Sequence, residues 1–262
     1  MTPKNALVLV EKKEGVVRIT LNRPDARNSL SLDLMTALQA ELDRIAEDRS
    51  ARVVLLAGNG KAFCAGHDLK EMLCLDEAAY QPLFESCSRI MLTLRRMPQP
   101  VIARVHAMAT AAGCQLVASC DLAVAGRSAR FATPGVNIGL FCSTPMVALS
   151  RNVPAKLAMH MLLTGEPINA DEALQYGLVS QVVDDEKLDV AVNALARNLA
   201  AKSSPTLALG KAAFYRQSEL SEEDAYRFTS AVMAQNLKAH DAQEGIQAFL
   251  DKRDPVWNRG QS

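Results

Sequence analysis

Ala62-Phe63-Cys64-Ala65-Gly66-His67-Asp68-Leu69 and Ala111-Ala112-Gly113-Cys114-Gln115-Leu116 are the two stretches that decide the fold of this chain. Each is predicted to follow a strand, to bend over small residues and then to enter a helix, the first with Asp68 as its N-cap. The backbone N–H groups at the start of a helix have no partner inside that helix. Two such turns that meet in space can therefore direct two N–H donors at one oxygen atom, as in an oxyanion hole. Ordinary strand-to-helix turns also need small residues, so the occurrence of two such turns is what favours a catalytic interpretation.

Strand-like and helix-like segments alternate around these two turns. The predicted strands are residues 7–11, 16–21, 52–57, 101–105, 121–125 and 179–183. Ser31 is predicted to cap a helix after the second strand, and a long amphipathic helix is predicted from Glu77 to Met97. This alternation predicts βαβ units and a mostly parallel sheet.

The pattern changes toward the C-terminus. From residue 187 to residue 252 every segment is predicted to be helical, with helix starts at Pro205 and Ser221. We therefore expect an α/β core over residues 1–200 followed by a helical region over residues 201–262.

The composition excludes several classes of protein. With 49% hydrophobic and 22% charged residues, the chain can bury a sizeable core. Its 29 basic residues balance its 29 acidic residues, so no overall charge favours nucleic acid or a membrane surface as a partner. No run reaches the roughly 20 apolar residues of a membrane-spanning helix. Since residues 1–11 lack the pattern of a targeting segment, we expect a cytoplasmic protein, or a mitochondrial-matrix protein if the chain is a processed eukaryotic one.

The cysteines give no sign of a metal site or a disulfide framework. The six cysteines are Cys64, Cys74, Cys87, Cys114, Cys120 and Cys142. No two of them form a C-x-x-C motif, and none lies at zinc-like spacing from a histidine. Most have apolar neighbours, which is typical of small buried residues in a reducing compartment. We expect neither disulfides nor a bound metal.

Further segments carry a family resemblance that extends over nearly the whole chain. These segments are Leu21-Asn-Arg-Pro24, Arg27-Asn-Ser-Leu30, the two turns, Phe131-Ala-Thr-Pro134, Leu163-Thr-Gly165 and Gly177-Leu-Val179. In this order and spacing they resemble the enoyl-CoA hydratase/isomerase (crotonase) superfamily. Residues 111–121 and 133–145 are most similar to its subgroup of enoyl-CoA hydratase domain-containing proteins. The resemblance implies the crotonase (ClpP-like) fold, an α/β spiral of ββα repeats with a C-terminal helical trimerisation layer. It also implies that residues 201–262 pack on the core and on neighbouring subunits, in a homotrimer or homohexamer.

The resemblance also implies the positions of the site residues. It places the two oxyanion-hole donors at the backbone N–H groups of His67 and Ala112, with Gly113 opening the helix. The substrate it implies is an acyl-CoA thioester, with coenzyme A as part of the substrate and no covalently bound cofactor. The residues it places near coenzyme A are Pro24, Ala26, Arg27, Ala65, Asp68 and Leu69, together with Phe249 and Lys252 contributed by a neighbouring subunit.

The chain departs from the family pattern at the catalytic acids. Hydratases of this family carry glutamate where this chain has Gln115 and Gly135, and no acidic residue occurs between Asp121 and Glu166. An amide cannot deprotonate water near neutral pH, and the loss of one acid–base group typically costs about 10²–10⁴-fold in rate. We therefore expect inefficient hydration, which glutamate at both positions should improve.

The remaining residues of the predicted site are candidates for lining the acyl pocket. They are Gly135, Asn137, Cys142 and Ser143, and the sequence offers no base beside them that could activate a nucleophile. The side chain of His67 is the one titratable group inside a predicted oxyanion turn, with an ordinary pKa of about 6.5.

Three functions stay open on this basis. The first is an acyl-CoA-binding enzyme that stabilises a thioester enolate. The second is a malonyl-type acyl-CoA decarboxylase or a thioesterase, since decarboxylation needs enolate stabilisation but no carboxylate base to start it. The third is a catalytically silent acyl-CoA sensor or scaffold.

Overall fold

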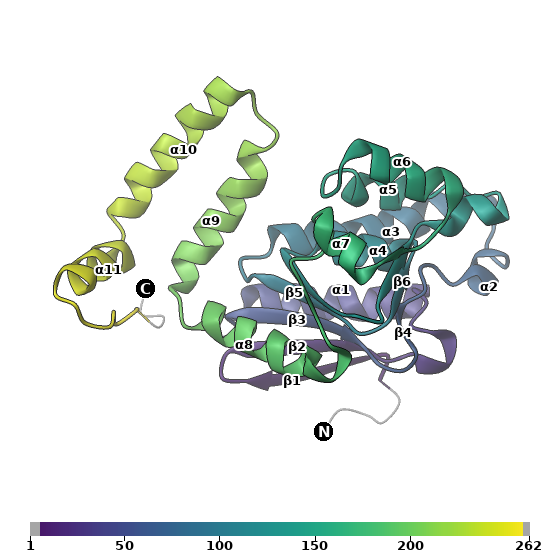
Figure 1. Cartoon of the computed structure of the whole chain (residues 1–262), viewed down its shortest axis with the longest axis horizontal. Helices are drawn as coiled ribbons and strands as arrows, with labels where there is room; N and C mark the ends of the chain where they lie inside the picture. Colours follow the sequence, from purple (N-terminus) through teal and green to yellow (C-terminus); the bar gives the residue numbers. More distant parts are fainter. Residues whose placement is uncertain (1–5, 259–262) are drawn as a thin grey trace.

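The larger of two sheets forms the centre of the molecule. The computed structural model describes residues 6–258 (Figure 1). The strands of this sheet, in spatial order, are β1 (Val8–Lys13), β2 (Val16–Leu21), β3 (Val53–Gly58), β5 (Val101–Val105), β7 (Leu122–Gly126) and β10 (Gln181–Val183). β1 and β2 form an antiparallel hairpin, and every other neighbouring pair is parallel. The six strands predicted from the sequence are confirmed, with boundaries that differ by at most two residues.

A second, smaller sheet positions the two turns. Its strands, in spatial order, are β4 (Ala62–Cys64), β6 (Met108–Thr110), β8 (Arg130–Ala132) and β9 (Ile168–Asn169). β4, β6 and β8 run parallel to one another, whereas β9 is antiparallel to β8. Because β4 and β6 are adjacent and parallel, the two turns that follow them leave the same edge of this sheet side by side.

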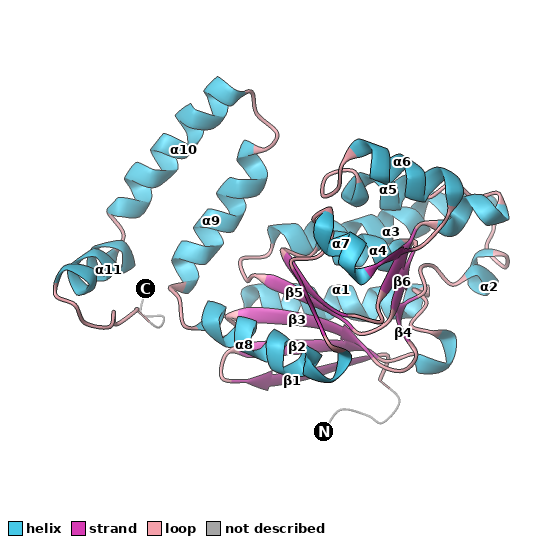
Figure 2. Ribbon diagram, viewed as in Figure 1, coloured by secondary structure: helices cyan, strands magenta, loops and turns pink. Residues whose placement is uncertain are grey.

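Helices cover both faces of the larger sheet (Figure 2). The helices that precede residue 201 are α1 (Leu32–Glu47), α2 (Leu69–Met72), α3 (Glu77–Arg96), α4 (Ala112–Ser119), α5 (Ser143–Leu149), α6 (Ala155–Thr164), α7 (Ala170–Gln175) and α8 (Leu188–Ala200), of which α1, α3 and α4 lie on one side of the sheet and α8 on the other. Alternate residues of a strand point to opposite faces. Accordingly Val54 and Leu56 of β3 join the core that contains α1, α3 and α4, while Val53 and Leu55 pack with α8.

The helix boundaries follow the expected local chemistry. The hydroxyl of Ser31 caps α1 by accepting a hydrogen bond from the N–H of Leu34 at 3.2 Å, as predicted. The α3 helix ends just before Pro98, which cannot donate to the helical ladder. No helix within residues 6–258 combines the length and the apolar character needed to cross a membrane.

The C-terminal helices extend away from the core as an arm (Figure 1). The arm consists of α9 (Ser204–Gln217), α10 (Glu222–Leu237) and α11 (His240–Leu250). Pro205 lies in the first turn of α9 and Ser221 caps α10, so both predicted helix starts are confirmed. Neither α9 nor α10 buries a residue within this chain, and Tyr226 and Met233 of α10 are exposed.

A partly buried ion pair fixes α9 of the arm to the core. Lys211 of α9 lies 2.7 Å from the carboxylate of Asp121, and the same ammonium donates to two main-chain carbonyls, those of Leu94 in α3 and Gln99 before β5, at 2.8 and 2.9 Å. Asp121 also accepts hydrogen bonds from the N–H of Val101 at 2.7 Å and from the hydroxyl of Tyr215 at 2.8 Å. Asp121 therefore satisfies a backbone donor and also anchors the arm.

Candidate functional site

The structure brings the two turns into direct contact. A Cβ atom built on Gly66 of the first turn would lie 2.9 Å from the Cβ of Ala111 and 3.4 Å from the nitrogen of Ala112 in the second turn. A Cβ atom on Gly113 would lie 2.1 Å from the carbonyl oxygen of Cys64. Glycine is therefore required at both positions, because the two turns lie so close together that any side chain would push them apart.

The backbone of the second turn is strained at Ala111. This alanine has φ 49° and ψ −118°, a conformation that L-amino acids rarely adopt. Its N–H donates to the carbonyl of Ala132 at 2.8 Å, and its own carbonyl accepts from the N–H of Gln115 at 3.0 Å. Such strain persists only where surrounding contacts enforce it, and it is concentrated at functional sites. Here it turns the chain sharply from β6 into α4.

The N–H groups of His67 and Ala112 have no backbone partners at this contact. In the first turn, Leu30 donates to the carbonyl of Gly66 at 2.7 Å and Asp68 donates to the carbonyl of Leu30 at 3.1 Å. The N–H of His67, which lies between these two bonds, donates to no carbonyl among residues 6–258. The N–H of Ala112, the first residue of α4, has no backbone acceptor in the described part of the chain either.

A cleft of about 1100 Å³ opens at the two turns. Its walls come from the loop at residues 23–29, residues 65–72, α3, residues 110–111 and the segment 134–145. Of the residues predicted from the sequence, those in its lining are Ala26, Arg27, Ala65, His67, Asp68, Leu69, Gly135, Asn137, Cys142 and Ser143. The remaining predicted residues lie outside the lining: Pro24 on the same loop, Ala112, Gly113 and Gln115 buried in α4, Phe249 in α11 and Lys252 directly after it.

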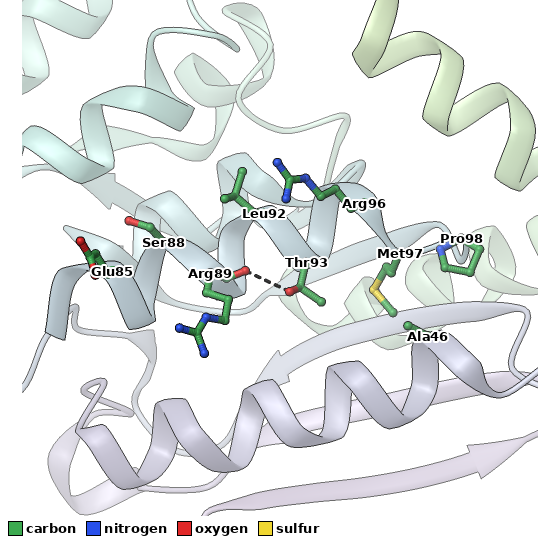
Figure 3. Close-up of a pocket in the computed structure, with 9 residues that line it drawn as sticks. All are labelled: Ala46, Glu85, Ser88, Arg89, Leu92, Thr93, Arg96, Met97 and Pro98. Carbon is green, nitrogen blue, oxygen red and sulfur yellow. Dashed lines mark hydrogen bonds between the residues drawn. The ribbon is translucent and has the colours of Figure 1, made fainter. Parts of the chain in front are cut away.

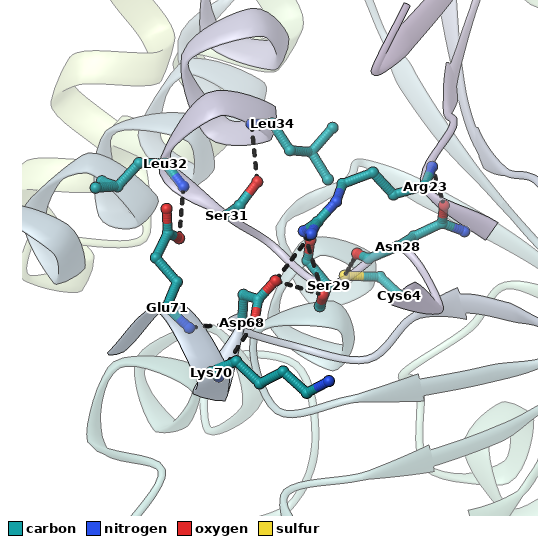
Figure 4. A network of polar contacts seen from close by, with 10 residues as sticks. All are labelled: Arg23, Asn28, Ser29, Ser31, Leu32, Leu34, Cys64, Asp68, Lys70 and Glu71. Carbon is teal, nitrogen blue, oxygen red and sulfur yellow. Dashed lines mark hydrogen bonds and ion pairs between the residues drawn. The ribbon is translucent and has the colours of Figure 1, made fainter. Parts of the chain in front are cut away.

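Asp68 holds the loop and the first turn together (Figure 4). Its carboxylate caps α2 by accepting from the N–H groups of Lys70 and Glu71 at 3.2 and 3.4 Å, as the sequence predicted. The guanidinium of Arg23 lies 2.9 Å from the same carboxylate. Burial alone would raise the pKa of Asp68, but the hydrogen bonds from Arg23 and Glu71 hold it below its usual value. Asp68 is therefore ionised, and its carboxylate is occupied by the cap of α2 and the ion pair with Arg23.

Asn28 is a positioning residue to which the sequence analysis assigned no role. It is fully buried with φ 55°, a left-handed conformation that asparagine tolerates better than most residues. Its side-chain amide donates to the carbonyls of Asn59, Ala62 and Phe63 at 2.8, 2.9 and 3.1 Å. It thereby fixes β4, the strand that leads into the first turn. The only signal in the sequence was its place in the motif Arg27-Asn-Ser-Leu30.

The imidazole of His67 packs against an aromatic neighbour. Its ring meets the ring of Phe84 edge to face, with centroids 5.2 Å apart and an interplanar angle of 83°. Burial lowers the pKa of His67 to about 4, because the charged form is poorly solvated there. The ring is therefore neutral at pH 7. Its Nε2 atom is buried and has no hydrogen-bond partner within residues 6–258.

The other three histidines lie away from this position. His106 binds the carbonyl of Gly60 through Nε2 at 2.9 Å, as expected for a packed imidazole, while His160 and His240 are exposed.

The inner part of the cleft contains no carboxylate. Among the described lining residues the acidic ones are Asp25, on the exposed loop, and Asp68, which is held by Arg23. Gln115 is buried, and its Oε1 atom has no hydrogen-bond partner in the described chain. Gly135 is closely covered, since a Cβ atom there would lie 2.0 Å from the carbonyl oxygen of Leu140.

A second hollow lies apart from the turns, between α1 and α3 (Figure 3). It has a volume of about 540 Å³ and is lined mainly by α3 residues such as Arg89, Leu92 and Arg96. None of the residues predicted from the sequence lines it. The described chain also holds no group of three or more His, Cys, Asp or Glu residues that could bind a metal ion.

The cysteines are free thiols. Five of the six are buried, and Cys74 is exposed.

Comparisons with known proteins identify the family of the chain. The family model described as enoyl-CoA hydratase/isomerase matches residues 11–260. The chain is 48% identical over 252 residues to enoyl-CoA hydratase domain-containing protein 3, mitochondrial, of Xenopus laevis, covering 96% of this chain and 86% of that protein. It is 36% identical over 250 residues to the 2,3-dehydroadipyl-CoA hydratase of Escherichia coli (strain K12), covering 95% and 97%. The crystal structure of an enoyl-CoA hydratase from Mycobacterium smegmatis has a TM-score of 0.94 at 53% identity, covering 96% and 99% of the two chains. The resemblance seen in the sequence, including that to the hydratase domain-containing subgroup, is confirmed.

Proposed function

The chain belongs to the enoyl-CoA hydratase/isomerase family and has the crotonase fold, and from that premise we propose that it binds an acyl-CoA thioester and stabilises the enolate of that thioester. The thioester carbonyl would lie at the contact between the two turns, with the acyl group in the cleft. The reaction would proceed without a carboxylate base from the protein.

The observation that carries this proposal is the pair of unpartnered N–H groups of His67 and Ala112. Both belong to turns that touch one another and border the same cleft. Donors held in place before the reaction stabilise charge on an oxygen without reorganisation, and one such donor is typically worth roughly 3 kcal/mol. An enolate places negative charge on the thioester oxygen, so two fixed donors there favour the enolate over the neutral thioester.

The coenzyme A part of the substrate would lie along the loop at residues 23–29. Arg27 and Lys70 line the cleft and are exposed, so their charges are available to phosphate groups. Phe249 is 81% exposed at the end of the arm. We propose that Phe249 and Lys252 reach the coenzyme A of a neighbouring subunit in a homotrimer or homohexamer, whose contacts would also cover Tyr226 and Met233 of α10.

The absence of a carboxylate in the inner cleft argues against efficient hydration. Addition of water to an enoyl thioester requires a group that deprotonates water, and neither Gln115 nor Gly135 can do so. Decarboxylation of a malonyl-type thioester is the second candidate, and the same observation favours it. There the breaking C–C bond delivers its electron pair to the α-carbon and CO₂ leaves, so the enolate forms without a protein base.

Acetoacetyl-CoA tests enolate stabilisation independently of any base. Its enolate absorbs at a longer ultraviolet wavelength than its keto form, so a site that favours the enolate increases this band on binding. We expect a saturable increase when the protein is added at constant pH. Binding without a spectral change would exclude enolate stabilisation, and the absence of binding would exclude the acyl-CoA site.

Two activity assays then separate the reactions. With crotonyl-CoA we expect little loss of the enoyl absorbance, and turnover at the rate of an efficient hydratase would refute the argument from Gln115 and Gly135. Release of CO₂ from methylmalonyl-CoA would support the decarboxylase, whereas no release from malonyl-type thioesters would remove it.

A further inference from the structure

The last described residues of the chain are tied to the arm by several polar contacts. This strap, residues 253–258, begins where the guanidinium of Arg253 binds the carboxylate of Glu244 in α11 at 2.6 and 2.9 Å. The N–H of Val256 donates to the same carboxylate at 2.8 Å. A guanidinium that binds a carboxylate through two nitrogens fixes direction as well as distance. Because chain ends are usually poorly ordered unless they are tied down, these contacts distinguish the strap from an ordinary terminus.

The far end of the strap reaches the junction between the core and the arm. The indole N–H of Trp257 donates at 2.8 Å to the carbonyl of Ala201, which directly follows α8. The indole ring covers Gly245 of α11, where a Cβ atom would lie 3.2 Å from two ring atoms. The N–H of Asn258 donates at 2.9 Å to the buried carboxylate of Asp241 in the first turn of α11. The strap therefore holds α11 at the junction, and Figure 1 shows the chain turning back after α11 toward the start of α9.

Lys252, between α11 and the strap, has a left-handed backbone. Its φ is 54°, a conformation in which lysine is uncommon and glycine is usual. At this helix end the N–H of Arg253 donates to the carbonyl of Ala248 at 3.0 Å, as in helices that end at a glycine. Strain of this kind persists where surrounding contacts enforce it, and it is concentrated at functional positions. Lysine in place of glycine therefore indicates a role for the charged side chain.

The strap fixes the end of α11 without covering it. Phe249 is 81% exposed, and Leu250 is exposed as well. The ammonium of Lys252 is exposed and forms no ion pair within residues 6–258. An aromatic ring and a free ammonium on a fixed backbone suit a ligand that combines an apolar ring with phosphate groups. Fixing them in advance lowers the entropy that is lost when such a ligand binds.

We propose that Glu244, Arg253 and Trp257, which close the strap, are positioning residues for a coenzyme A bound at a neighbouring subunit. They fix the backbone from which Phe249 and Lys252 project, and they touch no ligand themselves. This inference rests on the proposed function, which places those two side chains near the coenzyme A of a neighbour.

The test measures the dissociation constant of coenzyme A by titration calorimetry, with the full-length protein at one fixed concentration. Glu244→Gln breaks the ion pair with Arg253 at one end of the strap, and Trp257→Ala removes the contacts at the other end. We expect each variant to bind coenzyme A roughly 5- to 100-fold more weakly, because two side chains would then have to be ordered on binding. The control Glu219→Gln breaks another exposed ion pair of the arm, with Arg216, and should bind like the unaltered protein.

A double-mutant cycle separates positioning from general destabilisation. Lys252→Gly removes the ammonium but suits the left-handed backbone, so it should weaken binding without loss of stability. In the Lys252→Gly background, Glu244→Gln should weaken binding less than it does in the unaltered protein, because the strap has one side chain fewer to position. Equal effects in the two backgrounds would overturn the proposal.

Sedimentation velocity on the same samples separates positioning from assembly. The strap variants should keep the oligomeric state of the unaltered protein, and weaker binding that accompanies dissociation into smaller species would overturn the proposal. A monomeric unaltered protein would overturn it as well, since no neighbouring subunit would then exist. Unchanged affinity in Glu244→Gln and Trp257→Ala would refute the role of the strap and leave the acyl-CoA site intact. The absence of coenzyme A binding to the unaltered protein would refute both.

Discussion

The carbonyl of Leu140 covers Gly135 closely, and the distances give the expected loss in the free energy of unfolding when a side chain is added there. In Gly135→Ala, the new Cβ atom would lie 2.0 Å from the carbonyl oxygen of Leu140 and 2.9 Å from the Sγ atom of Cys142. Cβ atoms essentially never approach another heavy atom within 3.0 Å, so the carbonyl must move by about 1 Å (3.0 minus 2.0 Å). That carbonyl belongs to a tight loop closed by a hydrogen bond from the N–H of Leu140 to the carbonyl of Gly135 at 3.0 Å.

The expected cost combines two effects. Overpacking of this kind typically costs about 1–3 kcal/mol, and a weakened hydrogen bond adds roughly 1 kcal/mol. We therefore expect the free energy of unfolding of Gly135→Ala to fall by about 2–4 kcal/mol. Urea denaturation followed by circular dichroism measures it, at one fixed protein concentration because association with other subunits contributes to apparent stability.

Gly210→Ala is the matched control. Gly210 lies in α9, where an added Cβ atom meets nothing within 4 Å. Alanine has a higher helix propensity than glycine, so this variant should be more stable by about 0.5–1 kcal/mol. A loss below about 0.5 kcal/mol in Gly135→Ala would refute the reasoning, because ordinary surface substitutions fall within that range.

The close contact at Gly135 also affects whether glutamate can be introduced at positions 115 and 135. Glutamate at position 115 replaces one side chain by another of similar size, whereas glutamate at position 135 must first displace the main chain at Leu140. The two glutamate substitutions that are expected to improve hydration therefore differ in what they demand of the fold. Gln115→Glu is the change that the present fold accommodates, and Gly135→Glu also requires a rearranged loop.

Three further predictions concern the residues that hold the site and the arm. Asn28→Asp should lower the free energy of unfolding by roughly 3 kcal/mol in urea denaturation, since a buried carboxylate would face three carbonyl oxygens. Lys211→Met should cost about 3–5 kcal/mol in the same assay because it leaves the Asp121 carboxylate unpaired, and adding Asp121→Asn should recover part of the loss. The depressed pKa of His67, about 4 in the fold against about 6.5 in the unfolded chain, stabilises the fold above pH 6.5, and this contribution is lost as the pH falls toward 4. The unaltered protein should therefore lose about 2 kcal/mol more than His67→Phe between pH 7 and pH 5, and equal losses would contradict the shift.

Local signals in the sequence predicted those parts of the fold that depend on local chemistry. Ser31 and Asp68 were recognised as caps because an N-cap bond spans only two or three residues. The strands β4, β6, β8 and β9 were missed because each has only two or three residues and is stabilised by neighbours distant in sequence. The α5 helix was missed because Pro145 lies within it and its N-cap, Cys142, makes no capping bond.

The candidate site likewise combines features that the local sequence predicts with contacts that it does not reveal. The two turns could be recognised from their small residues, and the structure places them in contact. That contact depends on the pairing of β4 with β6, which no local pattern reveals. The position of Phe84 against His67 and the loop of Leu140 over Gly135 are likewise contacts between segments far apart in the chain or shaped by the fold. These contacts decide the charge of His67 and the space at Gly135.

The distribution of the cysteines has a practical consequence for spectroscopy. Burial raises the pKa of five thiols, those of Cys64, Cys87, Cys114, Cys120 and Cys142, which slows their reaction with maleimides. Cys74 is exposed and lies two residues after Met72, a residue of the cleft wall. A fluorophore added to the unmutated protein would therefore attach first at Cys74 beside the cleft, where its emission can report ligand entry in real time.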